Sequence, residues 1–187
     1  MRFLTLIILF IITFTFTGCQ EKNSNQNSQI NYTTNKANVQ KVYGEFCTNI
    51  TDKTPERLNN IKVGVEKLNG TKVNSGETFS FNDCIGPRNK ETGFKEAIIF
   101  DGHGNKTKGY GGGLCQISST LYNAAINAGM EITERHEHSR DVTYIEEGKD
   151  ATVAYGAEDL QFKNNSDSTV TINAKIDNDV LFITVQS

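Results

Sequence analysis

The sequence has no large excess of charged residues of either sign. Across 187 residues, 19 Lys and Arg side chains stand against 22 Asp and Glu, which gives a net charge of −3. No cluster of basic residues interleaved with aromatic residues occurs anywhere in the chain. Proteins that bind nucleic acid by neutralising phosphates carry such clusters. We therefore exclude that class and expect no nucleic-acid partner.

Hydrophobic residues are also few, at 36% of the chain against 22% charged residues. This composition supports one folded domain with a tail and excludes a bundle of membrane helices. The chain has no internal repeat. We expect a monomer.

The one long apolar run lies at the N-terminus. After Met1 and Arg2, residues 3–17 include 11 Phe, Leu or Ile side chains. Fifteen residues are short for a membrane span but have the length of a signal-peptide core. The run ends in Gly18-Cys19, which resembles a lipobox, so we predict a lipoprotein signal peptide over residues 1–19 with Cys19 lipidated. The alternative is an uncleaved signal anchor.

The segment after Cys19 is rich in amides. Residues 20–40 include 10 Asn or Gln and little that can be buried, which predicts a disordered tether. Residues 41–187 would then form a domain held by the Cys19 lipid at the outer face of the cell membrane.

Three cysteines remain in that domain. Outside the cell thiols tend to pair, and one of three must stay unpaired. We expect a disulfide between Cys47 and Cys84 and a free Cys115, because Cys115 lies in the most unusual local sequence. The alternative is that all three are reduced.

The apolar patterns predict two main helices and several strands in the domain. One helix covers residues 56–69, and the other covers 116–128 and carries Cys115 at its N-terminus. The polar composition of residues 101–108 predicts a loop. Strands are expected at 131–138, 142–145, 151–155 and 160–163, followed by a hairpin of 169–176 with 180–186. This is an α+β fold with a mostly antiparallel sheet.

A glycine-rich loop, Gly111, Gly112 and Gly113, delivers Cys115 to the start of the second helix. Glycines permit positive φ and the close approach of a substrate backbone. Unpaired N–H groups at the helix N-terminus favour a thiolate and can hold an oxyanion. We predict that Cys115 is a nucleophile, with the three glycines and Gln116 in the oxyanion loop. The alternative is a small buried cysteine at a tight turn.

A nucleophilic cysteine needs a base, and the chain has three histidines. His103 lies in the polar loop and is expected to be solvated. His136 and His138 are two apart on a predicted strand, so they should share a face and one should reach Cys115. The partner that orients the imidazole is Asp150, Asp159 or a backbone carbonyl. The alternative is a wet strand face with two histidines.

The same residues raise the possibility of zinc. A His-x-His pair together with Cys115 would supply three ligands. Neither His-Glu-x-x-His nor Cys-x-x-Cys occurs in the chain. We expect no metal and no cofactor.

The region from Asn69 to about Asn165 resembles the VanW domain, which is named from glycopeptide-resistance clusters. The segments that carry the resemblance are Asn69–Asn82, Ile85–Arg88, Gly93–Ala97, Gly111–Ala124 (G-G-G-L-C-Q-I-S-S-T-L-Y-N-A), Glu134–Ser139 and Gly148–Gly156.

Some VanW-domain proteins are described as L,D-transpeptidases, which form 3→3 cross-links in peptidoglycan. The resemblance implies Cys115 as nucleophile, His136 or His138 as base, and peptidoglycan stem peptides as partners. Arg88 or Arg135 would grip a substrate carboxylate, or be a solvated surface arginine, and Ser118 would contact substrate. The alternatives are a cysteine endopeptidase or amidase, a wall-binding module without activity, and a zinc hydrolase.

Overall fold

The computed structural model describes residues 42–100 and 105–187. The expected signal peptide, the lipidated Cys19, the tether and His103 lie outside the described residues. Within the described ranges, no helix has both the length and the apolar character needed to cross a bilayer.

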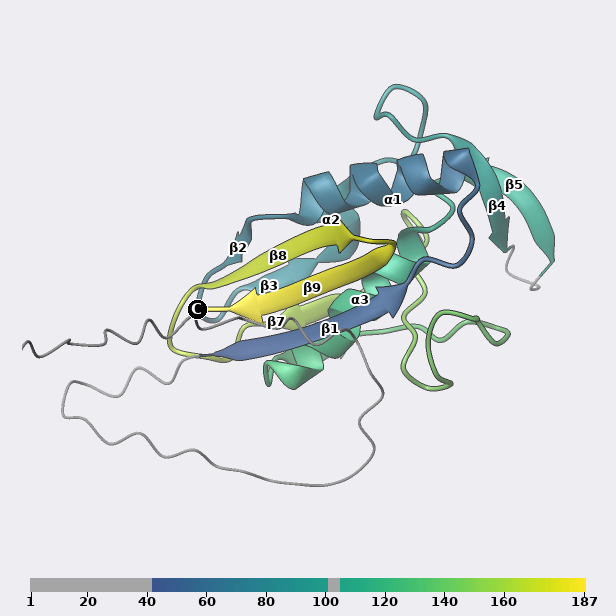
Figure 1. Ribbon diagram of the computed structural model, residues 1–187. Helices are drawn as coiled ribbons and strands as arrows, with labels where there is room; N and C mark the ends of the chain where they lie inside the picture. The colour runs from purple at the N-terminus through teal and green to yellow at the C-terminus, as the bar shows by residue number, and fades with distance from the viewer. Residues whose placement is uncertain (1–41, 101–104) are drawn as a thin grey trace, which may run out of the picture. The chain divides into compact units, whose positions relative to one another are not determined.

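A four-stranded antiparallel sheet forms one face of the fold (Figure 1). Its strand order is β1-β9-β8-β2, with bounds Tyr43–Asn49, Val180–Gln186, Val170–Asp177 and Thr71–Val73. The predicted β8–β9 hairpin is confirmed. Its two turn residues, Asn178 and Asp179, have φ of 47° and 65°, as a two-residue hairpin turn with the twist of the strands requires.

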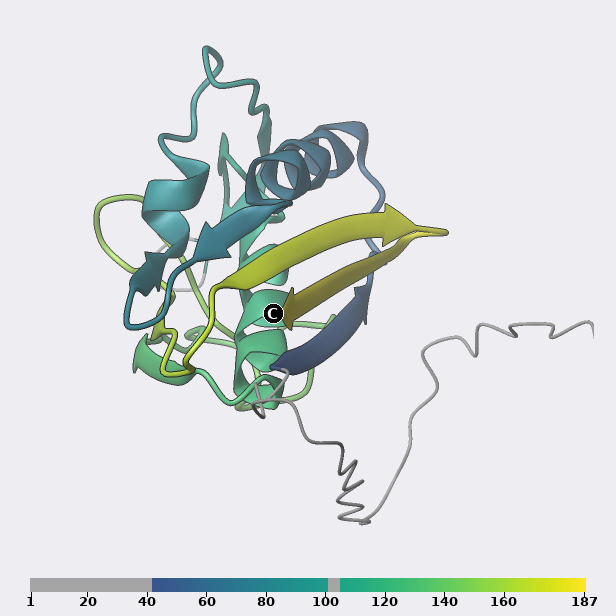
Figure 2. The same cartoon turned by 90° about the vertical axis from the view of Figure 1, so that its left-hand side faces the viewer.

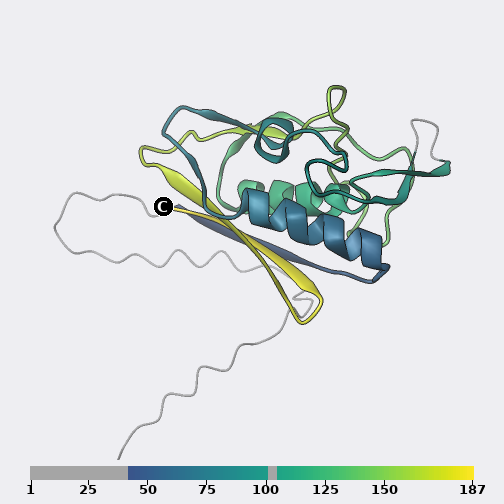
Figure 3. The same ribbon diagram turned by 90° about the horizontal axis from the view of Figure 1, so that it is seen from above.

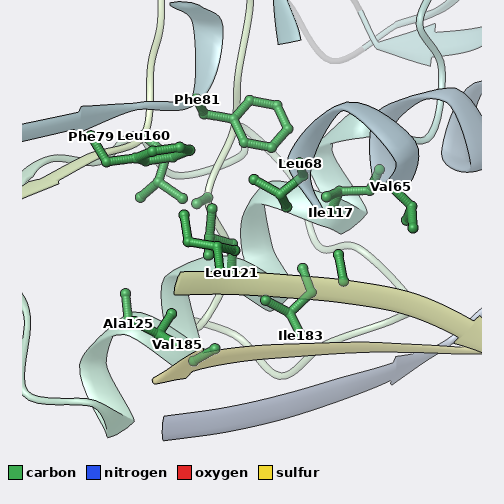
Figure 4. Close-up of a cluster of buried hydrophobic side chains, with 14 of the residues drawn as sticks. Val65, Leu68, Phe79, Phe81, Ile117, Leu121, Ala125, Leu160, Ile183 and Val185 are labelled. Atoms are coloured by element: carbon green, nitrogen blue, oxygen red, sulfur yellow. The ribbon is translucent and has the colours of Figure 1, made fainter. Parts of the chain in front are cut away.

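Two long helices pack on the inner face of this sheet. They are α1 (Pro55–Leu68) and α3 (Leu114–Asn127), close to the predicted bounds. In α3, Ile117, Leu121 and Ala125 recur at helical spacing and are fully buried. Figure 4 shows these side chains between Ile183 and Val185 of β9 and the aromatic cluster around Phe79.

A second antiparallel sheet covers the other side of the helices, as the view from above shows (Figure 3). Its order is β3-β7-β6, with bounds Thr78–Ser80, Gln161–Lys163 and Glu131–Glu134. A short helix, α2 (Phe81–Ile85), follows β3. The α+β fold with antiparallel sheets is confirmed. Because α3 lies between two sheets, its N-terminal residues have a fixed position.

A separate hairpin, β4 (Glu96–Phe100) with β5 (Lys106–Tyr110), stands beside the start of α1 (Figure 1). Figure 2 shows the opposite end of the fold, where β2, β8, β9 and β1 lie side by side. β5 leads directly into the glycine loop and α3. The prediction of a loop over 101–108 was wrong for β5, because its exposed lysines hide the strand pattern. β1 was also missed, since Gly44 and Cys47 interrupt its apolar alternation.

Two predicted strands are not formed. Residues 142–145 are turns, and residues 151–155 make only isolated bridges, from Thr152 to His136 and from Ala154 to Glu158. The strand predicted over 131–138 ends at Glu134. The backbone groups around Ala151 bond to side chains of α3 instead of to a neighbouring strand.

The expected Cys47–Cys84 disulfide is not formed, and Cys84 is a free thiol. Cys84 Sγ lies 3.5 Å from Thr71 Oγ1 in β2, whereas Cys47 lies in β1 at the opposite edge of the sheet. Three strand spacings separate the two edges, about 14 Å, and a disulfide needs Cα atoms within about 7 Å. Burial raises the pKa of the Cys84 thiol, although the Thr71 hydroxyl opposes the shift.

We predict that Gly44→Ala destabilises the domain by about 1–3 kcal/mol, the usual cost of overpacking. A Cβ on Gly44 would lie 2.2 Å from the Ala128 nitrogen and 2.3 Å from the Ala124 oxygen, so β1 would separate from α3. Urea unfolding measures the change. Asn49→Ala, at an exposed position of the same strand, is the control, and equal stabilities for the two variants would contradict the prediction.

Candidate active site

Cys115 is the second residue of α3, as predicted, and is half-buried. Gly113 caps the helix with φ 108°, a conformation that favours glycine. The N–H groups of Leu114 and Gln116 donate to the carbonyls of Gly111 and Gly113, both at 3.1 Å, so the glycine loop caps the start of the helix. The Cys115 thiol donates to the Val153 carbonyl over 3.7 Å. The sulfur therefore lies at the positive end of a helix whose position the core fixes.

The glycine loop is needed for contacts within the protein itself. A Cβ on Gly112 would lie 2.6 Å from the Ile98 oxygen of β4, and one on Gly113 would lie 2.8 Å from Ile61 of α1. Gly111 and Gly112 are buried. The expected close approach of a substrate backbone is thus replaced by Arg88 and Leu114 at Gly111 and by β4 at Gly112. The N–H groups of Gly113 and Cys115 remain as candidate oxyanion donors, because those of Leu114 and Gln116 donate to loop carbonyls.

Gln116 has a structural role, contrary to the prediction that it belongs to the oxyanion loop. Its side chain is only 1% exposed. Its amide donates to Thr48 Oγ1 and to the Asn49 carbonyl, both at 2.9 Å, and its oxygen accepts from Arg57 at 2.7 Å. These bonds use the amide fully and tie the start of α3 to β1 and α1. No local motif marked Arg57, which lies 59 positions away in the sequence.

His138 is the histidine that lies at the thiol. Its ring interacts with the Cys115 side chain, and its Nδ1 lies 2.5 Å from Asp150 Oδ2. The side chains of His138 and Asp150 are each 9% exposed. With Nδ1 bound to a carboxylate, Nε2 is the nitrogen available to the sulfur. Cys115, His138 and Asp150 are thus candidates for a nucleophile, a base and the group that orients the base.

The charges of this trio support one another. Burial lowers the pKa of His138, but the hydrogen bonds and charges of Cys115 and Asp150 outweigh it, and the pKa is raised overall. Burial alone would raise the pKa of Asp150, but the backbone N–H, ring and charge of His138 lower it. The imidazolium–carboxylate form is therefore favoured.

His136 lies apart from the site. Its Nε2 is 2.9 Å from Glu134 Oε1, and its side chain is 38% exposed. A spacing of two places side chains on one face only in a continuous strand, and β6 ends before either histidine. The prediction that the pair shares a face was therefore wrong. Within residues 42–100 and 105–187, no group of three or more His, Cys, Asp or Glu side chains is arranged to hold a metal ion.

Arg135 holds Asp150 in place and does not grip a substrate. Its Nη2 is 3.0 Å from Asp150 Oδ1, its Nε donates to the Asp150 carbonyl at 2.6 Å, and its Nη1 bonds Glu137. The other candidate carboxylate, Asp159, is occupied elsewhere, since it accepts from Ser80 and from the N–H groups of Asn82 and Leu160. Asp150 is therefore the carboxylate at the imidazole.

Buried hydroxyls of α3 fix the segment that carries Asp150. Ser118 Oγ donates to the Ala151 carbonyl at 2.6 Å, and Ser119 Oγ accepts from the Ala151 N–H at 2.9 Å. Asn123 donates to the Lys149 carbonyl at 2.7 Å. Ser118 is fully buried, so the prediction that it contacts substrate was wrong. The helix that carries the nucleophile also positions the carboxylate.

Arg88 lies beside the site, and its role as a substrate-binding residue stays a prediction. Its Nη2 donates to Asn82 Oδ1 at 2.6 Å, and its guanidinium stacks over the Tyr155 ring at 5.1 Å. Burial lowers its pKa, and the charge of Cys115 acts in the opposite direction. A cavity of about 450 Å³ adjoins His138 and Asp150 and is lined by residues of the 137–148 loop.

Comparison with known proteins gives this arrangement a family. The family model described as VanW like protein matches residues 56–186. An uncharacterized protein of Bacillus subtilis, YoaR, is 38% identical over 144 residues, which are 77% of this chain and 47% of the relative. The vancomycin B-type resistance protein VanW of Enterococcus faecalis is 30% identical over 129 residues, 64% of this chain and 45% of the relative. The chain spans about half the length of these curated relatives, and no solved structure matches it.

We predict that His138→Asn lowers the free energy of unfolding most between about pH 4 and pH 6.5. The raised pKa of His138 contributes stability below its unfolded value, near 6.5, and this is lost as pH rises through the folded pKa. The lowered pKa of Asp150 contributes stability above its unfolded value, near 3.9, and this is lost as pH falls through the folded pKa.

Urea unfolding of both proteins at pH 5, 7 and 9 measures this difference. His136→Asn, which removes a surface imidazole, is the matched control. A difference between wild type and His138→Asn that grows from pH 5 to pH 9 would contradict the pairing.

Proposed function

Because the chain belongs to the VanW-like protein family, we propose that it is a cysteine acyltransferase of the cell wall. The specific activity we propose is that of an L,D-transpeptidase, which forms 3→3 cross-links between peptidoglycan stem peptides. The observation that carries the proposal is the hydrogen bond between His138 and Asp150, together with the electrostatic interaction of the His138 ring with Cys115. We also propose that Cys19 is lipidated and holds the protein at the outer face of the membrane.

The first half of the reaction forms a thioester. The Cys115 thiolate attacks the carbonyl carbon between an L-centre and the terminal D-residue of a stem tetrapeptide. The oxyanion accepts hydrogen bonds from the backbone N–H groups of Gly113 and Cys115. The C–N bond then breaks, and His138 gives its proton to the departing amino group. Asp150 keeps the imidazolium oriented throughout.

The second half transfers the acyl group to an amine. A side-chain amine of another stem attacks the thioester, loses a proton to His138 and releases the thiolate. The cavity beside His138 leaves room for this acceptor, and carboxylates of Glu137, Asp141 and Glu146 line it. Although Arg140 also lines the cavity, the acidic side chains outnumber it and attract the protonated form of an amine, which loses a proton to solvent before it attacks. Water as acceptor would make the protein an endopeptidase or amidase with the same site.

We predict that Cys115→Ala abolishes turnover of tetrapeptide muropeptides and that His138→Ala lowers kcat by about 10²–10⁴-fold, the usual contribution of a general base. His136→Ala is the matched control and should keep most of the activity, since its side chain pairs with Glu134. The measurement is product formation by purified full-length protein. Equal losses in the two histidine variants would rule out His138 as the base.

Mass spectrometry of the products identifies the acceptor. Dimers linked 3→3 are expected for transfer, and shortened monomers would indicate hydrolysis instead. A wall-binding module without activity would give neither product, and Cys115 would then react with iodoacetamide no faster than a model thiol.

A further inference from the structure

The side chains of two arginines pack against the glycine loop that precedes Cys115. A Cβ on Gly111 would lie 2.9 Å from Arg88 Cγ, and one on Gly113 would lie 3.2 Å from Arg57 Cγ. Arg57 comes from α1, and Arg88 follows α2. Both charges act on Cys115. Two cations from different parts of the chain therefore interact electrostatically with Cys115.

Arg57 is largely occupied by protein partners. Its Nη2 donates to Gln116 Oε1 at 2.7 Å and its Nη1 to the Asp52 carbonyl at 3.1 Å. Its Nε is 3.9 Å from an Asp52 carboxylate oxygen. These contacts hold the start of α3, so Arg57 contributes charge at the site while its donors stay in the protein.

The guanidinium of Arg88 is not fully paired within the protein. One of its nitrogens donates to the neutral amide of Asn82, but within the described part of the chain no carboxylate lies within 4.0 Å of it. Its Nη1 is buried and has no hydrogen-bond partner. A half-buried cation with an unpaired donor is costly unless a ligand supplies an acceptor. The exposed ring of Tyr155 supports the guanidinium from one side.

We propose that Arg88 binds the terminal carboxylate of the donor peptide and so restricts the enzyme to chains that end one residue past the scissile bond. This inference rests on the proposed acyl transfer. In such a chain only three covalent bonds separate the scissile carbonyl carbon from the carboxylate carbon. Each further residue moves the carboxylate away by up to about 3.5 Å. A cation next to the thiol therefore selects tetrapeptide stems over pentapeptide stems, and guanidinium is well suited to a carboxylate.

The test compares a tetrapeptide muropeptide with its C-terminal amide. Wild type should show a kcat/KM about 10- to 100-fold higher for the free acid, the range for a hydrogen bond to a charged group. Arg88→Gln should act on both at the level of the amide, and Arg88→Lys, which keeps the charge without the fork, should fall between. Lys108→Gln, which removes an exposed cation of β5, is the control and should keep the full preference.

Equal activity of wild type on acid and amide, or an undiminished preference in Arg88→Gln, would overturn the inference while leaving acyl transfer intact. Binding separates the two proposals further. In a Cys115→Ala background, the Kd for the acid should be lower than for the amide, and Arg88→Gln should remove the difference. This measurement does not require turnover. It therefore tests the carboxylate site even if the reaction is not L,D-transpeptidation.

Discussion

The docking of the Asp150 segment onto α3 is the contact on which the site depends. Ser118, Ser119 and Asn123 replace a strand partner for residues 149–151. These three side chains lie one to two turns after Cys115 on the same helix. They therefore hold Asp150 at a fixed distance from Cys115. His138 then needs only to meet a carboxylate that is already in place. Two candidate catalytic groups from distant parts of the chain are thus positioned by the same helix.

Much of this arrangement was predictable because its signals are local. Glycine before a helical pattern placed Cys115 correctly, and the Asn178-Asp179 turn gave the last hairpin its register. The choice between His136 and His138 was not predictable, because where β6 ends depends on hydrogen-bond partners far along the chain. The same is true of Gln116 and Ser118. A polar residue next to a nucleophile has the same appearance in sequence whether it faces substrate or, as here, is buried and satisfied.

The roles of the arginines could not be predicted from the sequence either. Arg135 adjoins the histidines in sequence and was expected at the substrate, but it supports Asp150. Arg57 has no neighbouring motif and yet lies against the glycine loop. In each case the role follows from whether a carboxylate of the protein already neutralises the charge, and only the fold decides that.

The position of α3 between two sheets has a consequence for how such a domain can diversify. The helix that carries Cys115 is part of the hydrophobic core, whereas the cavity beside His138 is lined by a loop that carries little of that core. Exchange of residues along this loop would change the lining of the cavity without moving the sulfur. The position of Cys115 is thereby fixed by folding, whereas the lining of the cavity is open to selection.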